Sequence, residues 1–96
     1  MTRDQILDFL KQHKQEMHDR FGVIKIGLFG SYARGDARED SDIDIAVELE
    51  GVRLFRKFFA LESFLKSNLQ KDIDLGIEST LKSIVRERVA KEIQYV

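Results

Sequence analysis

The sequence predicts an α/β (α+β) fold, with a small mixed β-sheet flanked by helices in a single domain that spans residues 1–96. Two patterns support this prediction. Three short segments have the β-branched residues or the apolar–polar alternation of strands, and the segments around them repeat apolar residues at helical spacing. Alternation of helices and strands along a chain is typical of a sheet covered by helices.

The first third of the chain is expected to form a helix, a strand and a short helix. Thr2 and Gln5 have capping-box spacing, and apolar residues then recur at helical period, which predicts one helix that ends before Gly22. Residues 23–29 are apolar and β-rich, as in a strand that is covered on both faces. The polar segment that follows can form only a short helix, because Gly35 ends it.

The remainder is expected to add two strands and two helices. Residues 42–49 alternate between an apolar face and an acidic face, and residues 71–77 repeat this alternation. Between them, residues 54–69 place leucines and phenylalanines at helical spacing. A last helix is predicted from its apolar residues, which are Leu81, Ile84, Val85, Val89 and Ile93.

Composition argues against several classes of protein. The 16 Lys and Arg residues are balanced by 17 Asp and Glu residues, and a net charge of −1 disfavours a nucleic-acid interface, which needs a clustered positive excess. The chain has no cysteine, so neither a disulfide framework nor a thiolate zinc site can form. It shows no signal peptide and no apolar run of membrane-spanning length, and it is therefore expected to be cytoplasmic.

Acidic residues at the start of two strands predict a divalent-metal site. Asp42 and Asp44 lie two residues apart on one strand, so their side chains share a face at about 6.5–7 Å along the chain. Two such carboxylates repel one another unless a proton or a cation intervenes, and Mg²⁺ prefers hard oxygen ligands. If the third strand lies beside the second, Asp72 or Asp74 completes a three-carboxylate site for one or two ions. The alternative is that these aspartates only solubilise the strand ends.

The Gly30–Ser31 turn precedes these carboxylates and predicts an anion site. Its surroundings do not match the dinucleotide-binding fingerprint, the P-loop or the EF-hand loop. Gly30 still lets a ligand approach the backbone closely, Ser31 can cap the short helix, and free N–H groups at a helix N-terminus bind phosphate oxygens. The alternative is an ordinary helix N-cap. An anion site beside a cation site suits a metal-chelated triphosphate.

The combined pattern resembles a known family. The segment GSYARGDAREDSDIDIAV resembles the signature of the minimal nucleotidyltransferase (MNT) branch of the DNA polymerase β-like nucleotidyltransferases, and KDIDLG is similar to the third-strand motif of that family. The resemblance implies the nucleotidyltransferase fold and attack by an acceptor hydroxyl on the α-phosphorus of a nucleoside triphosphate, with release of pyrophosphate. It also implies that Asp42 and Asp44 hold Mg²⁺ on the triphosphate. Asp74 then completes the metal site and helps to deprotonate the acceptor.

On the phosphate side, the resemblance implies that Gly30 and Ser31 bind the β- and γ-phosphates and that ATP is the nucleotide. Arg34 has two interpretations, contact with a phosphate or a solvent-facing position on the short helix. Tyr32 is expected to pack in the core rather than to line the nucleotide pocket.

Larger relatives carry an acceptor-binding domain, which this chain is expected to lack, so the acceptor or a partner must complete the site. The chain is similar to the antitoxins of HEPN–MNT toxin–antitoxin modules (the MntA type). This implies Mg²⁺-dependent transfer of AMP from ATP to a tyrosine of a HEPN ribonuclease toxin, without direct contact to nucleic acid or membrane. Two alternatives stay open: an antitoxin that masks the toxin by stoichiometric binding without chemistry, and a small-molecule nucleotidyltransferase that dimerises.

Two further features are interpreted more simply. Residues 54–69 carry phenylalanines that cannot share one narrow stripe, which indicates either a two-sided core helix or a partner-binding face; they are Phe55, Phe58, Phe59 and Phe64. His13 and His18 have no fixed spacing to carboxylates and are expected to be structural or solvated rather than metal ligands.

Overall fold

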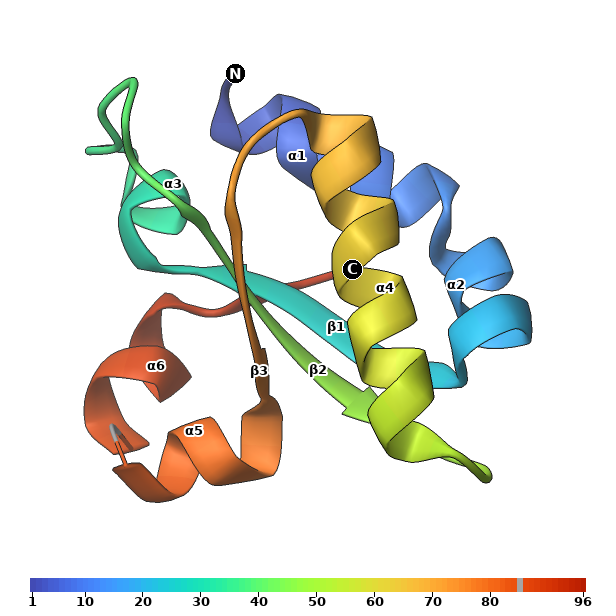
Figure 1. The fold of residues 1–96 in the computed structure, drawn as a ribbon. Coiled ribbons are helices and arrows are strands. Elements are labelled where there is room, and N and C mark those ends of the chain that lie inside the picture. Colours follow the sequence, from blue (N-terminus) through green and yellow to red (C-terminus); the bar gives the residue numbers. More distant parts are fainter. Residues whose placement is uncertain (85) are drawn as a thin grey trace.

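The computed structural model describes residues 1–84 and 86–96 of the chain. It contains a mixed four-stranded sheet with helices on both faces (Figure 1). The helices are α1 (Arg3–Gln12), α2 (Lys14–Phe21), α3 (Gly30–Arg34), α4 (Leu54–Leu69), α5 (Glu78–Ile84) and α6 (Arg86–Glu92), and the strands are β1 (Val23–Phe29), β2 (Ile43–Leu49), β3 (Ile73–Ile77) and β4 (Gln94–Tyr95). The predicted fold class is therefore confirmed.

The strands follow the order β3-β2-β1-β4. Strand β1 pairs antiparallel with both β2 and β4, whereas β2 and β3 are parallel and are joined through α4. This parallel pair brings the starts of β2 and β3 to the same end of the sheet, where the sequence places its aspartates.

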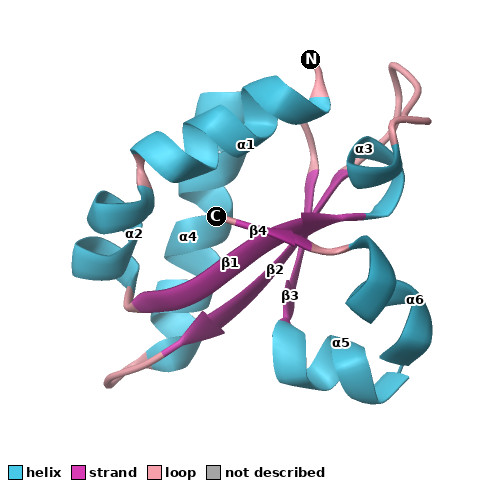
Figure 2. Ribbon diagram, turned by 180° about the vertical axis from the view of Figure 1, so that it is seen from behind, coloured by secondary structure: helices cyan, strands magenta, loops and turns pink. Residues whose placement is uncertain are grey.

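One face of the sheet carries the hydrophobic core, under α1, α2 and α4 (Figures 1 and 2). The alternation in β2 buries Ile43, Ile45 and Val47 completely on this face. Full burial of one such side chain stabilises the fold by about 1.5–3 kcal/mol. The residues that meet the sheet from the helices are also buried, among them Ile6, Leu10, Met17, Leu61 and Leu65.

The opposite face is lined by small residues and lies against the segment from α5 to β4. Gly27, Ala46 and Gly76 are register partners across β1, β2 and β3. A Cβ atom on Gly27 would lie 2.7 Å from Ile93, and one on Gly76 would lie 2.8 Å from Leu81. The absence of side-chain bulk therefore lets this segment approach the sheet closely.

The N-terminal helix differs from its prediction. The Thr2 capping box is present, but the predicted single helix is two helices, because the backbone leaves helical geometry at His13. The Nδ1 atom of His13 donates to the Phe9 carbonyl at 2.8 Å, and its ring stacks on the Phe9 ring at 4.1 Å. His13 thus has a structural role.

The prediction of a single C-terminal helix is also wrong. The segment forms α5, α6 and then β4, whose Gln94 and Tyr95 pair with β1. Ile93 continues the apolar spacing in the sequence but lies beyond the end of α6 and contacts Gly27. Val85, and the side chains of Ile84 and Val89 that entered the same prediction, lie outside the described residues.

Candidate active site

Asp44 and Asp74 lie beside each other at the end of the sheet where β2 and β3 begin. They are register partners on the parallel strands β2 and β3. The pKa of Asp44 is raised to about 6, first by burial and then by the neighbouring charges of Asp74 and Asp42. A cation at this position would remove the cost of placing these charges together.

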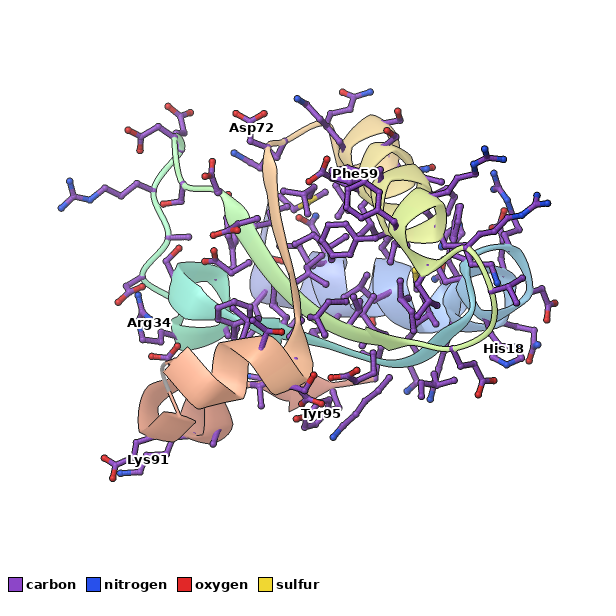
Figure 3. All side chains as sticks on the ribbon, turned by 60° about the horizontal axis from the view of Figure 1, so that its bottom comes forward. His18, Arg34, Phe59, Asp72, Lys91 and Tyr95 are labelled. Carbon is purple, nitrogen blue, oxygen red and sulfur yellow. The ribbon has the colours of Figure 1, made fainter. Side chains whose placement is uncertain are left out.

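Asp42 and Asp72 occupy different surroundings. Asp42 is exposed, directly before β2, and contributes to the repulsion that raises the pKa of Asp44. Asp72 precedes β3 and pairs with Lys66 of α4 at 3.3 Å (Figure 3). Asp74, rather than Asp72, is therefore the residue that β3 brings to Asp44.

The donor set fits Mg²⁺ as part of a nucleotide complex. Within residues 1–84 and 86–96, no group of three His, Cys, Asp or Glu side chains stands close enough to hold a metal ion unaided. Mg²⁺ is usually bound through one or two carboxylates together with substrate phosphates and water. The Asp44–Asp74 pair supplies the carboxylates for such a complex.

The Gly30–Ser31 turn lies against Asp44. Gly30 has a φ of +74°, and a Cβ atom there would overlap the Asp44 carboxylate, so only glycine fits. The prediction that Ser31 caps the short helix is wrong, because α3 begins at Gly30 and its N-cap residue, Phe29, makes no side-chain cap. Instead, the Gly30 N–H donates to Oε2 of Glu92 at 3.2 Å.

Arg34 is held by carboxylates. Its Nη1 atom donates to Glu92 Oε1 at 2.9 Å and its Nε atom to Asp36 Oδ2 at 3.2 Å. These partners, Glu92 first, raise the pKa of Arg34. The side chain is 33% exposed, on the side of α3 that faces α6 (Figure 3). No pattern in the sequence singles out Glu92, which has the spacing of an ordinary polar residue on a helix.

The loop between α3 and β2 is attached to the start of β3. Lys71 Nζ donates to the Glu39 carbonyl at 2.7 Å and lies over the Tyr32 ring at 5.9 Å. Tyr32 is buried and packs with the core, as expected. Lys71 therefore holds the loop between α3 and β2 next to the start of β3, where Asp74 lies.

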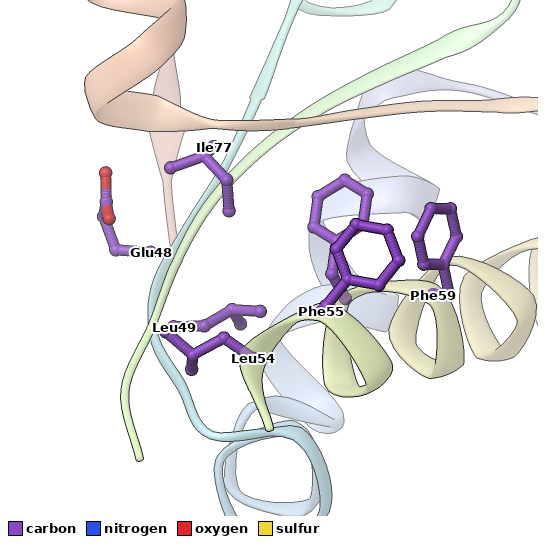
Figure 4. A pocket seen from close by; sticks show the side chains of 7 residues that line it. Glu48, Leu49, Leu54, Phe55, Phe59 and Ile77 are labelled. Atoms are coloured by element: carbon purple, nitrogen blue, oxygen red, sulfur yellow. The ribbon is translucent and has the colours of Figure 1, made fainter. Parts of the chain in front are cut away.

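The phenylalanines of α4 divide between core and surface. Phe58 and Phe64 pack against the core, whereas Phe55 is 79% exposed and Phe59 is 47% exposed. A two-sided core helix is therefore wrong for Phe55 and Phe59. Their rings meet edge to face at 4.9 Å and line an apolar groove of about 410 Å³ (Figure 4), together with Glu48, Leu49, Leu54, Phe58 and Ile77.

Comparison with known proteins identifies the family. The family model of the Nucleotidyltransferase domain matches residues 10–96. Protein adenylyltransferase MntA of Thermococcus cleftensis is 45% identical over 96 residues, which cover 100% of this chain and 97% of the relative.

Two solved structures share the fold. A minimal nucleotidyltransferase superposes with a TM-score of 0.79 at 32% identity, over 98% of this chain and 95% of that chain. A toxin–antitoxin crystal structure with AMP-PNP superposes with a TM-score of 0.68 at 26% identity, over 99% of this chain and 72% of that chain. The predicted resemblance and enzyme class are confirmed: the chain belongs to the nucleotidyltransferase domain family.

Proposed function

We propose that this protein is an antitoxin that transfers AMP from ATP to a tyrosine of a HEPN ribonuclease toxin, with Mg²⁺ as cofactor. The observation that carries the proposal is the Asp44–Asp74 pair next to the Gly30–Ser31 turn, since it places oxygen donors for a cation beside a backbone that a triphosphate can approach. Similarity to an MntA adenylyltransferase and to a toxin–antitoxin complex with AMP-PNP supports the reaction and the partner.

In this mechanism each carboxylate has its own task. Asp42 and Asp44 would hold Mg²⁺ and Asp74 would complete the metal site, and the ion would supply charge neutralisation and orientation for the triphosphate. Asp74 is exposed at the start of β3 and can accept the phenolic proton as the tyrosine oxygen attacks the α-phosphorus. The new bond joins that oxygen to phosphorus, and the bond to the pyrophosphate oxygen breaks.

Incubation with the toxin tests the proposal directly. The purified pair, with α-labelled ATP and Mg²⁺, should give a labelled toxin whose mass has increased by one or more AMP groups. Peptide mapping should place the group on tyrosine, and a toxin with that tyrosine changed to phenylalanine should stay unlabelled. A folded, nucleotide-binding protein that leaves its toxin unlabelled would contradict the proposal.

A second candidate, masking of the toxin without chemistry, is favoured by one observation, the exposure of Phe55 and Phe59. Replacement of Asp42 and Asp44 by asparagine separates the two functions. Loss of protection from the toxin with an intact complex supports catalysis, whereas unchanged protection supports masking.

We also place the protein in the cytoplasm, where ATP and a ribonuclease target are both present. Among the helices of the described residues, none has the length and apolar character that a bilayer crossing requires.

A further inference from the structure

Glu92 contacts both of the groups near the Gly30–Ser31 turn that could bind a phosphate. Its Oε2 atom accepts from the Gly30 N–H at 3.2 Å, and its Oε1 atom accepts from Arg34 Nη1 at 2.9 Å. The Glu92 side chain is only 14% exposed. Backbone amides and guanidinium groups are the donors that proteins commonly use for phosphate oxygens, so the carboxylate has the partners of a bound phosphate.

The elements around Glu92 fix its position. Glu92 is the last residue of α6, and Gln94, two residues later, begins β4. The Nε2 atom of Gln94 donates to the Ala33 carbonyl at 3.2 Å. Two neighbouring side chains therefore hold both ends of α3, with Glu92 at Gly30 and Gln94 at Ala33.

A phosphate oxygen and the Glu92 carboxylate require the same donors. The Gly30 N–H has a single hydrogen, and Arg34 already donates to Glu92 and to Asp36. Two anions at one amide also repel each other, and the repulsion grows where water is excluded. A triphosphate can therefore use the Gly30 N–H, and the Arg34 hydrogen that Glu92 accepts, only after the Glu92 side chain has moved.

We propose that Glu92 occupies the phosphate position in the nucleotide-free protein and that the bound triphosphate displaces it, taking over the Gly30 N–H and the Arg34 guanidinium. This inference rests on the proposed function, because it assumes that the Gly30–Ser31 turn binds the β- and γ-phosphates. The apparent nucleotide affinity is then reduced by the fraction of molecules in which Glu92 still holds the turn. Glu92 thus regulates access to the site.

Nucleotide binding by charge-neutral variants tests the inference. The probe is Mg·AMP-PNP, and its Kd is measured by calorimetry for the wild type, Glu92→Gln and Glu87→Gln. Glu87 is exposed on the same helix and provides a matched loss of charge away from the turn. We expect Glu92→Gln to bind about 3–10-fold more tightly than the wild type, as removal of a competing state predicts, and Glu87→Gln to stay within about twofold. Equal or weaker binding by Glu92→Gln would overturn the inference.

The two proposals fail in different ways. A wild type that does not bind Mg·AMP-PNP contradicts the proposed function and the inference together. A wild type that binds and transfers AMP, while Glu92→Gln binds no more tightly, contradicts the inference alone.

A second measurement does not depend on whether Glu92→Gln folds. In the isotope-labelled wild type, Mg·AMP-PNP should shift the NMR resonances of the Gly30 amide, the Arg34 Nε–H and the Glu92 side-chain carboxyl carbon together. A Glu92 carboxyl resonance that stays unchanged at saturating nucleotide would show that the carboxylate keeps its donors and would also overturn the inference.

Discussion

Asp44 and Asp74 are register partners on adjacent parallel strands, and after burial the charge of Asp74 is the main cause that raises the pKa of Asp44. Asp44 therefore keeps its proton to a higher pH than a free aspartate, and its ionised form is one that a divalent cation would stabilise.

The first prediction concerns stability without metal. Because the folded-state pKa of Asp44 is raised from 3.8 to about 6, the folded protein holds this proton more tightly than the unfolded chain. Stability should fall as the pH rises from about 4 to 6, and Asp44→Asn should not show this loss. Urea denaturation in a chelator should find the variant more stable than the wild type by about 1–2 kcal/mol at pH 7, after allowance for solvent screening. Asp40→Asn, in an exposed loop, is the control, and an equal gain there would point to net charge instead.

The second prediction concerns metal binding. Mg²⁺ binds the ionised carboxylate, so protons and Mg²⁺ compete for Asp44. The affinity for Mg²⁺ in the presence of AMP-PNP should fall about tenfold for each pH unit below about 6, the pKa of this group, and should level off above it. Calorimetric titration between pH 5 and 8 measures this dependence. An affinity that is constant across the range would exclude Asp44 as a ligand.

The third prediction separates two glycines of positive φ. Gly30 has a φ of +74° and Gly35 has a φ of +85°. A methyl group on Gly30 overlaps the Asp44 carboxylate, whereas nothing lies within 4 Å of one on Gly35. Gly35→Ala should therefore cost about 1 kcal/mol of the free energy of unfolding, from backbone strain alone, and Gly30→Ala should cost about 2–4 kcal/mol. Chemical denaturation of both variants is the measurement, and equal losses would mean that Asp44 does not restrict the turn.

The fourth prediction concerns the groove on α4. Phe55 and Phe59 are exposed, so changing both to serine should alter the free energy of unfolding by less than about 0.5–1 kcal/mol. If the groove binds the toxin, the same change should weaken the complex at least about tenfold, since large aromatic residues dominate interface energies. Ile24→Ser removes an exposed apolar side chain from β1 and serves as the control. Surface plasmon resonance measures the affinity of each variant for the toxin. An unchanged affinity would show that the toxin binds to another surface.

Local patterns predicted β1, α3 and β2 because each is specified by residues close together in the sequence. The alternation around Asp44 and the glycine at position 30 determine both the local structure and the position of the site residues. His13 could not be predicted as a helix break, because the break depends on its bond to Phe9 and its ring contacts. Glu92 is a stronger example: its contact with Gly30 spans 62 residues, and only the folded chain brings the two together. The roles of the site residues stay predictions until nucleotide and metal binding are measured.

The long separation between Gly30 and Glu92 has a consequence for the order of folding. Contacts that close large loops form late, because chain entropy opposes them until local structure is in place. The hairpin of β1 and β2 can form early, whereas docking of β4, which has two residues, must wait. Amide hydrogen exchange should accordingly be faster in β4 than in β2, and the Gly30–Ser31 turn should reach its final arrangement only in this last step.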